Sequence, residues 1–157
     1  MTNLYRAHAG GLVRLAVIMV GDRATAEDVV QEAFCGLYRR WPHLTDTAKA
    51  LGYARSAVLN GCRTIQRHRA RRTGHRIPEP ACASAEAVAL IGEEHRAVLA
   101  ALQTLPSRQR EALVLRYFAD LADGEIALAM GICQGTVKST ISRGIAALGK
   151  LLGKEDS

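Results

Sequence analysis

Polar and basic residues that could contact a polyanion recur at helical spacing in the first half of the chain. One face of a predicted helix carries Tyr53, Ser56, Asn60, Arg63 and Arg67, and the helix ends in the run RHRARR (67–72). Arginine neutralises phosphates, whereas asparagine and tyrosine hydrogen-bond to, or stack on, a base exposed from a duplex. This face therefore favours nucleic-acid binding. The alternative for the RHRARR run is a solvated basic helix end.

A second polar set lies in the segment Glu125–Ile145, EIALAMGICQGTVKSTISRGI. Ala127 is the small residue expected where two helices cross, and Gly131 takes the turn, where a positive φ costs little only for glycine. The apolar residues that would hold the second helix in place are Ile126, Met130, Ile132, Val137 and Ile141. The residues that face outward are Gln134, Thr136, Lys138, Ser139 and Arg143. The pattern predicts a helix-turn-helix that reaches bases and phosphates; an ordinary helical hairpin with a solvated polar face is the alternative.

An acidic and polar stripe lies on the helix predicted over 23–40. Its members, spaced i, i+3, i+4 and i+7, are Asp28, Gln31, Glu32 and Cys35. This spacing places them on one side of the helix, opposite its apolar face. Taken alone, the stripe is typical of a solvated acidic helix face.

Residues that would indicate an enzyme are missing from the sequence. There is no Gly-rich phosphate loop, no paired nucleophile and base, and no cluster of metal ligands. The cysteines, at positions 35, 62, 82 and 133, form no CxxC pattern, so no zinc site is expected. We interpret them as small buried residues of a reducing cytoplasm. The sequence thus predicts no catalytic residue, no cofactor and no metal.

Helical periodicity runs through nearly the whole chain and predicts the elements that position these residues. The expected helices are 2–20, 23–40, 47–71, 85–105, 107–119, 123–130 and 134–152. The segment 73–84 contains a glycine and two prolines and is typical of a linker. We therefore predict an all-α fold with two small helical domains joined by a flexible linker. A three-helix domain spans 1–72, the linker 73–88, and a helix-turn-helix domain 89–157.

Charge and composition agree with this organisation. The chain has 157 residues, with 21 Lys and Arg against 15 Asp and Glu. Residues 1–72 hold 12 basic and 5 acidic residues, whereas residues 89–157 hold 8 of each, so attraction to nucleic acid is concentrated in the first domain. The uncharged run that begins at Leu15 and ends before Asp22 is too short to span a bilayer. We expect a soluble, cytoplasmic protein.

Two groups of motifs give the chain a family resemblance. LPSRQREALVLRYFADL (105–121), followed by EIA, GTVKS and the pair Ser142–Arg143, is similar to region 4 of the extracytoplasmic-function sigma factors. GDRATAEDVVQEAF (21–34) and YARSAVLNGCR (53–63) are similar to their region 2. The chain therefore resembles this group (group IV) of the sigma-70 family, in its actinobacterial form, along nearly its whole length.

The resemblance implies an RNA polymerase sigma factor that binds core polymerase and directs promoter recognition, DNA opening and transcription initiation. It implies that Asp28, Gln31 and Glu32 dock on a basic coiled coil of the polymerase's large subunit. The residues implied at the −10 element are Tyr53, Asn60, Arg63, Arg67, Arg69 and Arg71. Those implied at the −35 element are Gln134, Thr136, Lys138, Ser139 and Arg143. An anti-sigma protein is a further implied partner.

A protein that opens DNA needs residues that separate the strands or hold a flipped base, and both aromatic and loop residues are candidates here. We interpret Tyr38 and Trp41 as core residues. The loop between Pro42 and Lys49 is the better candidate for holding a flipped base.

The last helix departs from the family pattern. Arginine is common in the family where Thr140 and Gly149 stand, and alanine where Gly144 stands. Each interior glycine should cost the helix roughly 1 kcal/mol relative to alanine, and Cys133 is a weak residue for starting a helix. We therefore expect weak −35 recognition. Two alternatives are a stand-alone helix-turn-helix regulator and a degenerate sigma-like protein that acts through protein contacts.

Overall fold

The computed structural model describes residues 1–73 and 85–155, which form helices joined by turns. The described residues contain no strand, and the predicted all-α class is confirmed. The chain divides into two compact units, Met1–Arg76 (unit 1) and Ile77–Ser157 (unit 2). Most of the predicted linker lies outside the described residues, although a helix already begins within its bounds at Ala85.

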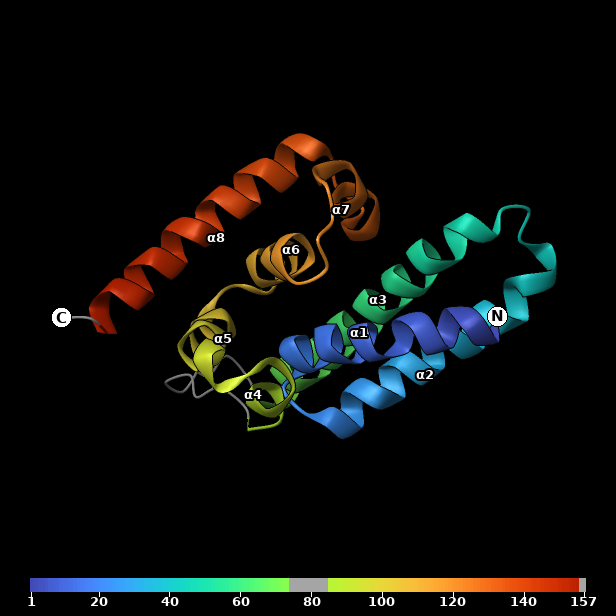
Figure 1. The fold of residues 1–157 in the computed structure, drawn as a ribbon. Coiled ribbons are helices and arrows are strands. Elements are labelled where there is room, and N and C mark those ends of the chain that lie inside the picture. The colour runs from blue at the N-terminus through green and yellow to red at the C-terminus, as the bar shows by residue number, and fades with distance from the viewer. Residues whose placement is uncertain (74–84, 156–157) are drawn as a thin grey trace. The chain divides into compact units, whose positions relative to one another are not determined.

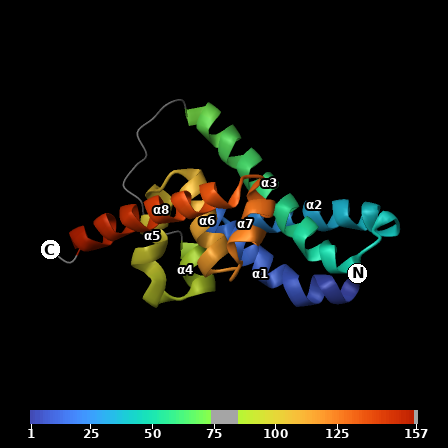
Figure 2. The ribbon, with the colours of Figure 1, turned by 90° about the horizontal axis from the view of Figure 1, so that it is seen from above.

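Unit 1 consists of three helices that lie side by side and contact one another pairwise (Figures 1 and 2). They are α1 (Thr2–Val20), α2 (Arg23–Arg40) and α3 (Ala50–Thr73). The first two have the predicted bounds. The third starts at Ala50 rather than at the predicted Thr47, because a 3-10 turn, η2 (Thr47–Lys49), precedes it. Another 3-10 turn, η1 (Trp41–His43), ends the second helix.

The core of unit 1 is built from the apolar side chains that recur at helical spacing on the three helices. Among the most deeply buried are Met19, Val30, Leu37, Val58, Leu59 and Cys62. Gly61 lies at a close contact between α3 and α2, because a Cβ atom there would lie 2.7 Å from Val29 Cγ1. A glycine at this position lets the two helices pack without displacing Val29.

The turn between α1 and α2 follows from two adjacent residues. Gly21 adopts a φ of 89°, a left-handed conformation that favours glycine, and its N–H donates to Val17 O at 2.7 Å to close α1. Asp22 then starts α2, because its carboxylate accepts the N–H of Thr25 at 2.8 Å. Both helix ends are therefore satisfied locally.

Helix α3 fastens this turn from the side. Arg69 donates to Val20 O, and its Nη2 donates to Asp22 Oδ1 at 2.9 Å. One helical turn earlier, Gln66 Nε2 donates to Met19 O at 2.9 Å. These bonds satisfy the last carbonyls of α1 and tie the three helices together at one end; we call this set of contacts the α1–α2 clamp.

Unit 2 contains shorter helices in addition to one long one. They are α4 (Ala85–Ile91), η3 (Glu93–His95), α5 (Arg96–Thr104), α6 (Ser107–Tyr117), α7 (Asp123–Met130) and α8 (Gln134–Glu155). The prediction of one helix over 85–105 was wrong. Gly92 breaks it with a φ of 122°, and its N–H closes α4 by donating to Val88 O at 2.8 Å. The apolar periodicity continues across this break, so it gave no sign of it.

The end of α5 is held by a half-buried arginine of α6. Arg110 donates to Leu102 O at 2.9 Å, to Gln103 O at 3.1 Å and to Leu105 O at 3.1 Å. Burial lowers the pKa of its guanidinium, but the pKa of arginine is so high that the group stays charged. One side chain thus bonds three carbonyls at this helix end, and the Leu102 carbonyl also accepts the N–H of Leu105 at 3.2 Å.

The α1–α2 clamp can be tested through the stability of unit 1. Asp22→Ala removes a helix cap and should lower the free energy of unfolding by about 1 kcal/mol. Arg69→Ala should also destabilise unit 1, whereas Arg71→Ala, at an exposed position on the same helix, should not. Urea unfolding followed by Trp41 fluorescence measures this unit selectively, because Trp41 is the chain's one tryptophan.

The same clamp predicts a pH dependence. Hydrogen bonds from the N–H and then the hydroxyl of Thr25, followed by the contact with Arg69, hold the pKa of Asp22 below its ordinary value. Its stabilising contribution is therefore present above roughly pH 4 and is lost as pH falls through the lowered pKa. Asp22→Asn should reduce this loss.

In the stability test, equal unfolding free energies for the Arg69→Ala and Arg71→Ala variants would contradict the clamp.

Candidate functional site

The acidic stripe of α2 is exposed, as its spacing predicts. The apolar residues of α2 pack against α1 and α3, which turns the other side of the helix to solvent. The exposed residues of that side include Asp28, Gln31, Glu32 and Cys35. Among the described residues Asp28 has no ion pair, and Glu32 Oε1 lies 3.8 Å from Arg39 Nη2 in an exposed pair that contributes little. The stripe thus presents negative charge to solvent.

The interpretation of the cysteines as buried residues holds for Cys62 and is wrong for Cys35 and Cys133, which are exposed; Cys82 lies outside the described residues. Cys35 belongs to the outward side of α2. Cys133 precedes α8 and takes the place of a helix cap, with its Sγ 3.1 Å from Thr136 Oγ1. The hydrogen bond with the Thr136 hydroxyl, followed by one from the Thr136 N–H, lowers the pKa of the Cys133 thiol. The sulfur thus contacts a side chain in the first turn of α8.

Helix α3 concentrates the positive charge of unit 1. It contains six arginines and no acidic residue. Asn60, Arg67 and Arg71 are exposed, and the half-buried Arg63 donates from Nη1 to Asn60 Oδ1 at 2.7 Å. Arg69, predicted as a phosphate contact, instead points its guanidinium into the α1–α2 clamp. Only the surrounding fold distinguishes it from its neighbours in the RHRARR run.

Tyr53 lies two helical turns before Asn60 on the same side of α3, but it is less exposed. Its side chain is half-buried, and the Arg40 guanidinium carbon lies 5.3 Å from the centre of its ring. A Cβ atom placed on Gly36 of α2 would lie 3.7 Å from the Tyr53 hydroxyl. The ring therefore lies across the contact between α2 and α3, and Arg40 covers part of it.

The prediction that Tyr38 is a core residue is wrong, because its side chain is 69% exposed. Leu37 takes the position that faces the core, and Tyr38 lies about 100° further round the helix. There it borders a shallow pocket with Tyr5 and Cys35. Trp41, in the 3-10 turn that follows, is half-buried.

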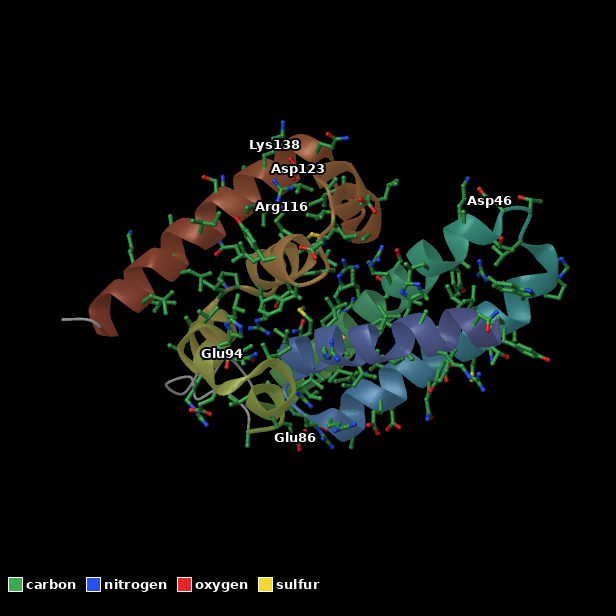
Figure 3. The ribbon with its side chains drawn as sticks, in the orientation of Figure 1. Asp46, Glu86, Glu94, Arg116, Asp123 and Lys138 are labelled. Carbon is green, nitrogen blue, oxygen red and sulfur yellow. The ribbon has the colours of Figure 1, made fainter. Side chains whose placement is uncertain are left out.

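The loop between Pro42 and Lys49 is short and largely exposed. Asp46, at its end next to α3 (Figure 3), accepts the N–H of Ala48 at 3.0 Å and so starts the 3-10 turn. The Asp46 side chain therefore has a structural role in the loop. The proposed role of the loop in holding a base stays a prediction.

The helix-turn-helix of unit 2 forms as its pattern predicts. Gly131 takes a φ of 68°, and its N–H donates to Ala127 O at the end of α7. The apolar residues expected to hold the second helix are buried or half-buried. The exposed residues of α8 include all five of the predicted outward set, Gln134, Thr136, Lys138, Ser139 and Arg143. One face of α8 is therefore open along the predicted contact residues.

Arg116 was not predicted as a site residue, yet it lies beside the helix-turn-helix. Its Nη1 donates to Asp123 Oδ1 at 2.5 Å, which joins the end of α6 to the start of α7 (Figure 3). Both residues line a pocket of about 290 Å³ together with Lys138 of α8. The two residues are seven positions apart and lie on different helices, so the periodicity of a single helix could not reveal their contact.

Other kinds of site find little support in the described residues. No group of three metal-ligating side chains occurs among them. No helix in the described part of the chain is long and apolar enough to cross a membrane.

Comparison with known families assigns both units. The family described as Sigma-70 region 2 matches residues 4–72, and Sigma-70, region 4 matches residues 95–148. The chain is an extracytoplasmic-function sigma factor of the sigma-70 family. A match over residues 4–72 is not expected of a stand-alone helix-turn-helix regulator. Sigma factors are transcription regulators rather than enzymes.

Curated relatives cover this sigma factor almost completely. The RNA polymerase sigma-E factor of Streptomyces coelicolor is 34% identical over 158 residues, which cover 96% of this chain and 85% of that protein. The ECF RNA polymerase sigma factor SigL of Mycobacterium tuberculosis is 32% identical over 161 residues, or 94% and 86% of the two chains.

Solved structures share the fold of this sigma factor. The sigma factor RpoE from Bartonella quintana, in complex with the anti-sigma factor NepR, has a TM-score of 0.75 at 22% identity and covers 98% of both chains. CnrH, in complex with the cytosolic domain of CnrY, has a TM-score of 0.73 at 23% identity, over 99% of this chain and 88% of that one.

The glycines in the last helix of this sigma factor are not equivalent. Gly144 is buried, and a Cβ atom there would lie 2.9 Å from Leu113 Cδ1 of α6. Gly149 has nothing within 4 Å of such an atom. The expectation that both glycines merely weaken the helix is therefore wrong for Gly144, which lets α6 approach α8.

This difference predicts opposite outcomes for the same substitution. Gly149→Ala should strengthen α8 by about 1 kcal/mol, because it adds helix propensity in open space. Gly144→Ala should gain less or lose stability, because Leu113 must move. Hydrogen–deuterium exchange of α8 in the full chain measures both effects. Equal gains in protection would contradict a close contact at Gly144.

Proposed function

We propose that this sigma factor docks on the basic coiled coil of the polymerase's large subunit through Asp28, Gln31 and Glu32. All three side chains are exposed on one side of α2, and among the described residues the two carboxylates are at most weakly paired. Opposite charges on the partner would steer association and fix its orientation. The family resemblance assigns these residues to polymerase binding, and their exposure on α2 supports the same docking surface.

We propose further that α3 holds the −10 element of the promoter. The observation that carries this assignment is the separation of charge between neighbouring helices, since α3 has six arginines and no acidic residue. Asn60 would contact an exposed base, and Arg63, Arg67 and Arg71 would contact phosphates. Arg69 would act indirectly by holding α1 and α2 in place.

For the −35 element we propose α8 of the helix-turn-helix. The residues that would contact DNA are Gln134, Thr136, Lys138, Ser139 and Arg143. Their exposure along α8 supports this role, because a recognition helix reads the major groove through residues near its N-terminus. Arg116 would position the start of α7 through its ion pair with Asp123.

These assignments describe a transcription initiation factor that acts in the cytoplasm without catalytic chemistry of its own. The sigma factor RpoE and CnrH, both of similar fold, were each captured with a protein partner. We propose that an anti-sigma protein likewise binds this chain.

Charge reversal on α2 tests the polymerase contact. Asp28→Arg with Glu32→Arg should abolish binding of the full chain to core RNA polymerase, because like charges would face each other at a cost of several kcal/mol. Glu27→Arg is the matched control, since Glu27 lies on the same helix but outside the stripe and, among the described residues, pairs with Arg23 at the surface. Competition against labelled wild-type chain measures the affinity. Wild-type affinity of the double variant would refute the docking assignment.

Salt dependence tests the DNA contacts of α3. Arg67→Ala with Arg71→Ala should lower the affinity of the holoenzyme for all promoter sequences and reduce the salt slope by about one unit for each phosphate that is no longer neutralised. Asn60→Ala should mainly impair opening of the cognate promoter. Arg69→Ala should lower stability, with a smaller change in salt slope than the double variant. A double variant with the wild-type slope would exclude these phosphate contacts.

A further inference from the structure

A groove runs along the contact between α2 and α3 in unit 1. Its volume is about 510 Å³, and it is open to solvent. The residues that line it are Thr25, Asp28, Val29, Glu32, Ala33 and Gly36 of α2 and Tyr53, Ala57, Gly61, Thr64 and Ile65 of α3. We call it the α2/α3 groove. It includes both carboxylates of the acidic stripe, although the spacing of the stripe predicts no more than an exposed helix surface.

Small residues create the space. Ala33 and Gly36 lie on α2, and Ala57 and Gly61 lie on α3, so little side-chain volume fills the contact. Gly61 also allows the close approach of the helices at Val29. The resulting surface is mostly apolar and suits the methylene groups of a long side chain.

The charged residues of the groove all have one sign. Asp28 and Glu32 are one helical turn apart and both are exposed, which places two carboxylates beside an apolar surface. A lysine or arginine combines an apolar stem with a positive head group and matches this arrangement. An acidic partner side chain would be repelled by these carboxylates, and a purely apolar one would not pair with them.

Tyr53 contributes to the same groove. Its hydroxyl lies near Gly36, and its ring lines the groove, while Arg40 lies over the ring without lining the groove. We therefore place Arg40 on the side of the ring away from the groove. This position explains why Tyr53 is half-buried, whereas Asn60 on the same helix is exposed.

We propose that the α2/α3 groove receives a lysine or arginine side chain from the polymerase coiled coil. The stem lies against Ala57 and Tyr53, and the head group is bound between Asp28 and Glu32. Tyr53 thus belongs to the polymerase-binding surface rather than to the −10 contacts. The proposal rests on the docking function assigned above and specifies the part of the surface that anchors the partner.

Filling the groove without changing its charge is the direct test. Ala57→Leu should weaken binding of the full chain to actinobacterial core RNA polymerase by at least about tenfold, the effect typical of losing one interface anchor. Ala7→Leu, the same change at an exposed position of α1, should bind within about twofold of wild type. Tyr53→Ala should weaken binding like Ala57→Leu, whereas Tyr53→Phe keeps the ring and should not. Urea unfolding followed by Trp41 fluorescence confirms that each variant is folded.

A neutral pair of substitutions tests the charge of the occupant. Asp28→Asn with Glu32→Gln should weaken binding and flatten its salt dependence, because neither side chain can then pair with the basic head group. A salt dependence equal to that of wild type would overturn the basic occupant.

The outcomes separate this proposal from the docking function. If charge reversal at Asp28 and Glu32 abolishes binding but Ala57→Leu and Tyr53→Ala bind normally, the groove is not used and the docking function stands. If charge reversal also has no effect, the docking function itself fails. If Tyr53→Ala binds polymerase normally but its holoenzyme no longer binds −10 DNA, Tyr53 is a DNA contact and the proposal is wrong.

Discussion

The close approach of α2 and α3 at Gly61 is the constraint on which the rest of unit 1 depends. A side chain at this position would meet Val29 of α2, so only glycine allows the observed spacing. That spacing brings the acidic side of α2 next to the arginine-rich α3 while leaving a groove between them. The α1–α2 clamp then holds the other helix of the bundle against this pair. Helix packing thus decides which charges face a partner.

Arginines of this chain serve two different purposes that their sequence context does not separate. Arg67 and Arg71 are exposed on α3, whereas Arg69 between them satisfies the end of α1 and pairs with Asp22. In unit 2, Arg110 likewise binds carbonyls. The planar guanidinium with five donors suits both carbonyl groups and phosphates. A count of basic residues therefore overstates the surface charge that DNA can use.

Periodicity predicted most of the fold, including the bounds of α1, α2 and α7, because capping residues and glycines mark those ends. It failed where the determining contact is distant in sequence. The break at Gly92 interrupts an unbroken apolar pattern, and the contact of Gly144 with Leu113 depends on how α6 crosses α8. The same reason explains the site: the exposed sets on α2 and α8 followed from spacing, but the location of Tyr53 required the packing of two helices.

Arg110 restricts which sequences can replace this one during evolution. Its guanidinium reaches three carbonyls at the end of α5 at once. Lysine preserves the charge but has a single compact ammonium in place of a rigid fork, so it cannot reproduce this geometry. Surface positions tolerate replacement of arginine by lysine, but position 110 should not. Loss of the arginine would remove the three side-chain bonds that join α6 to the end of α5.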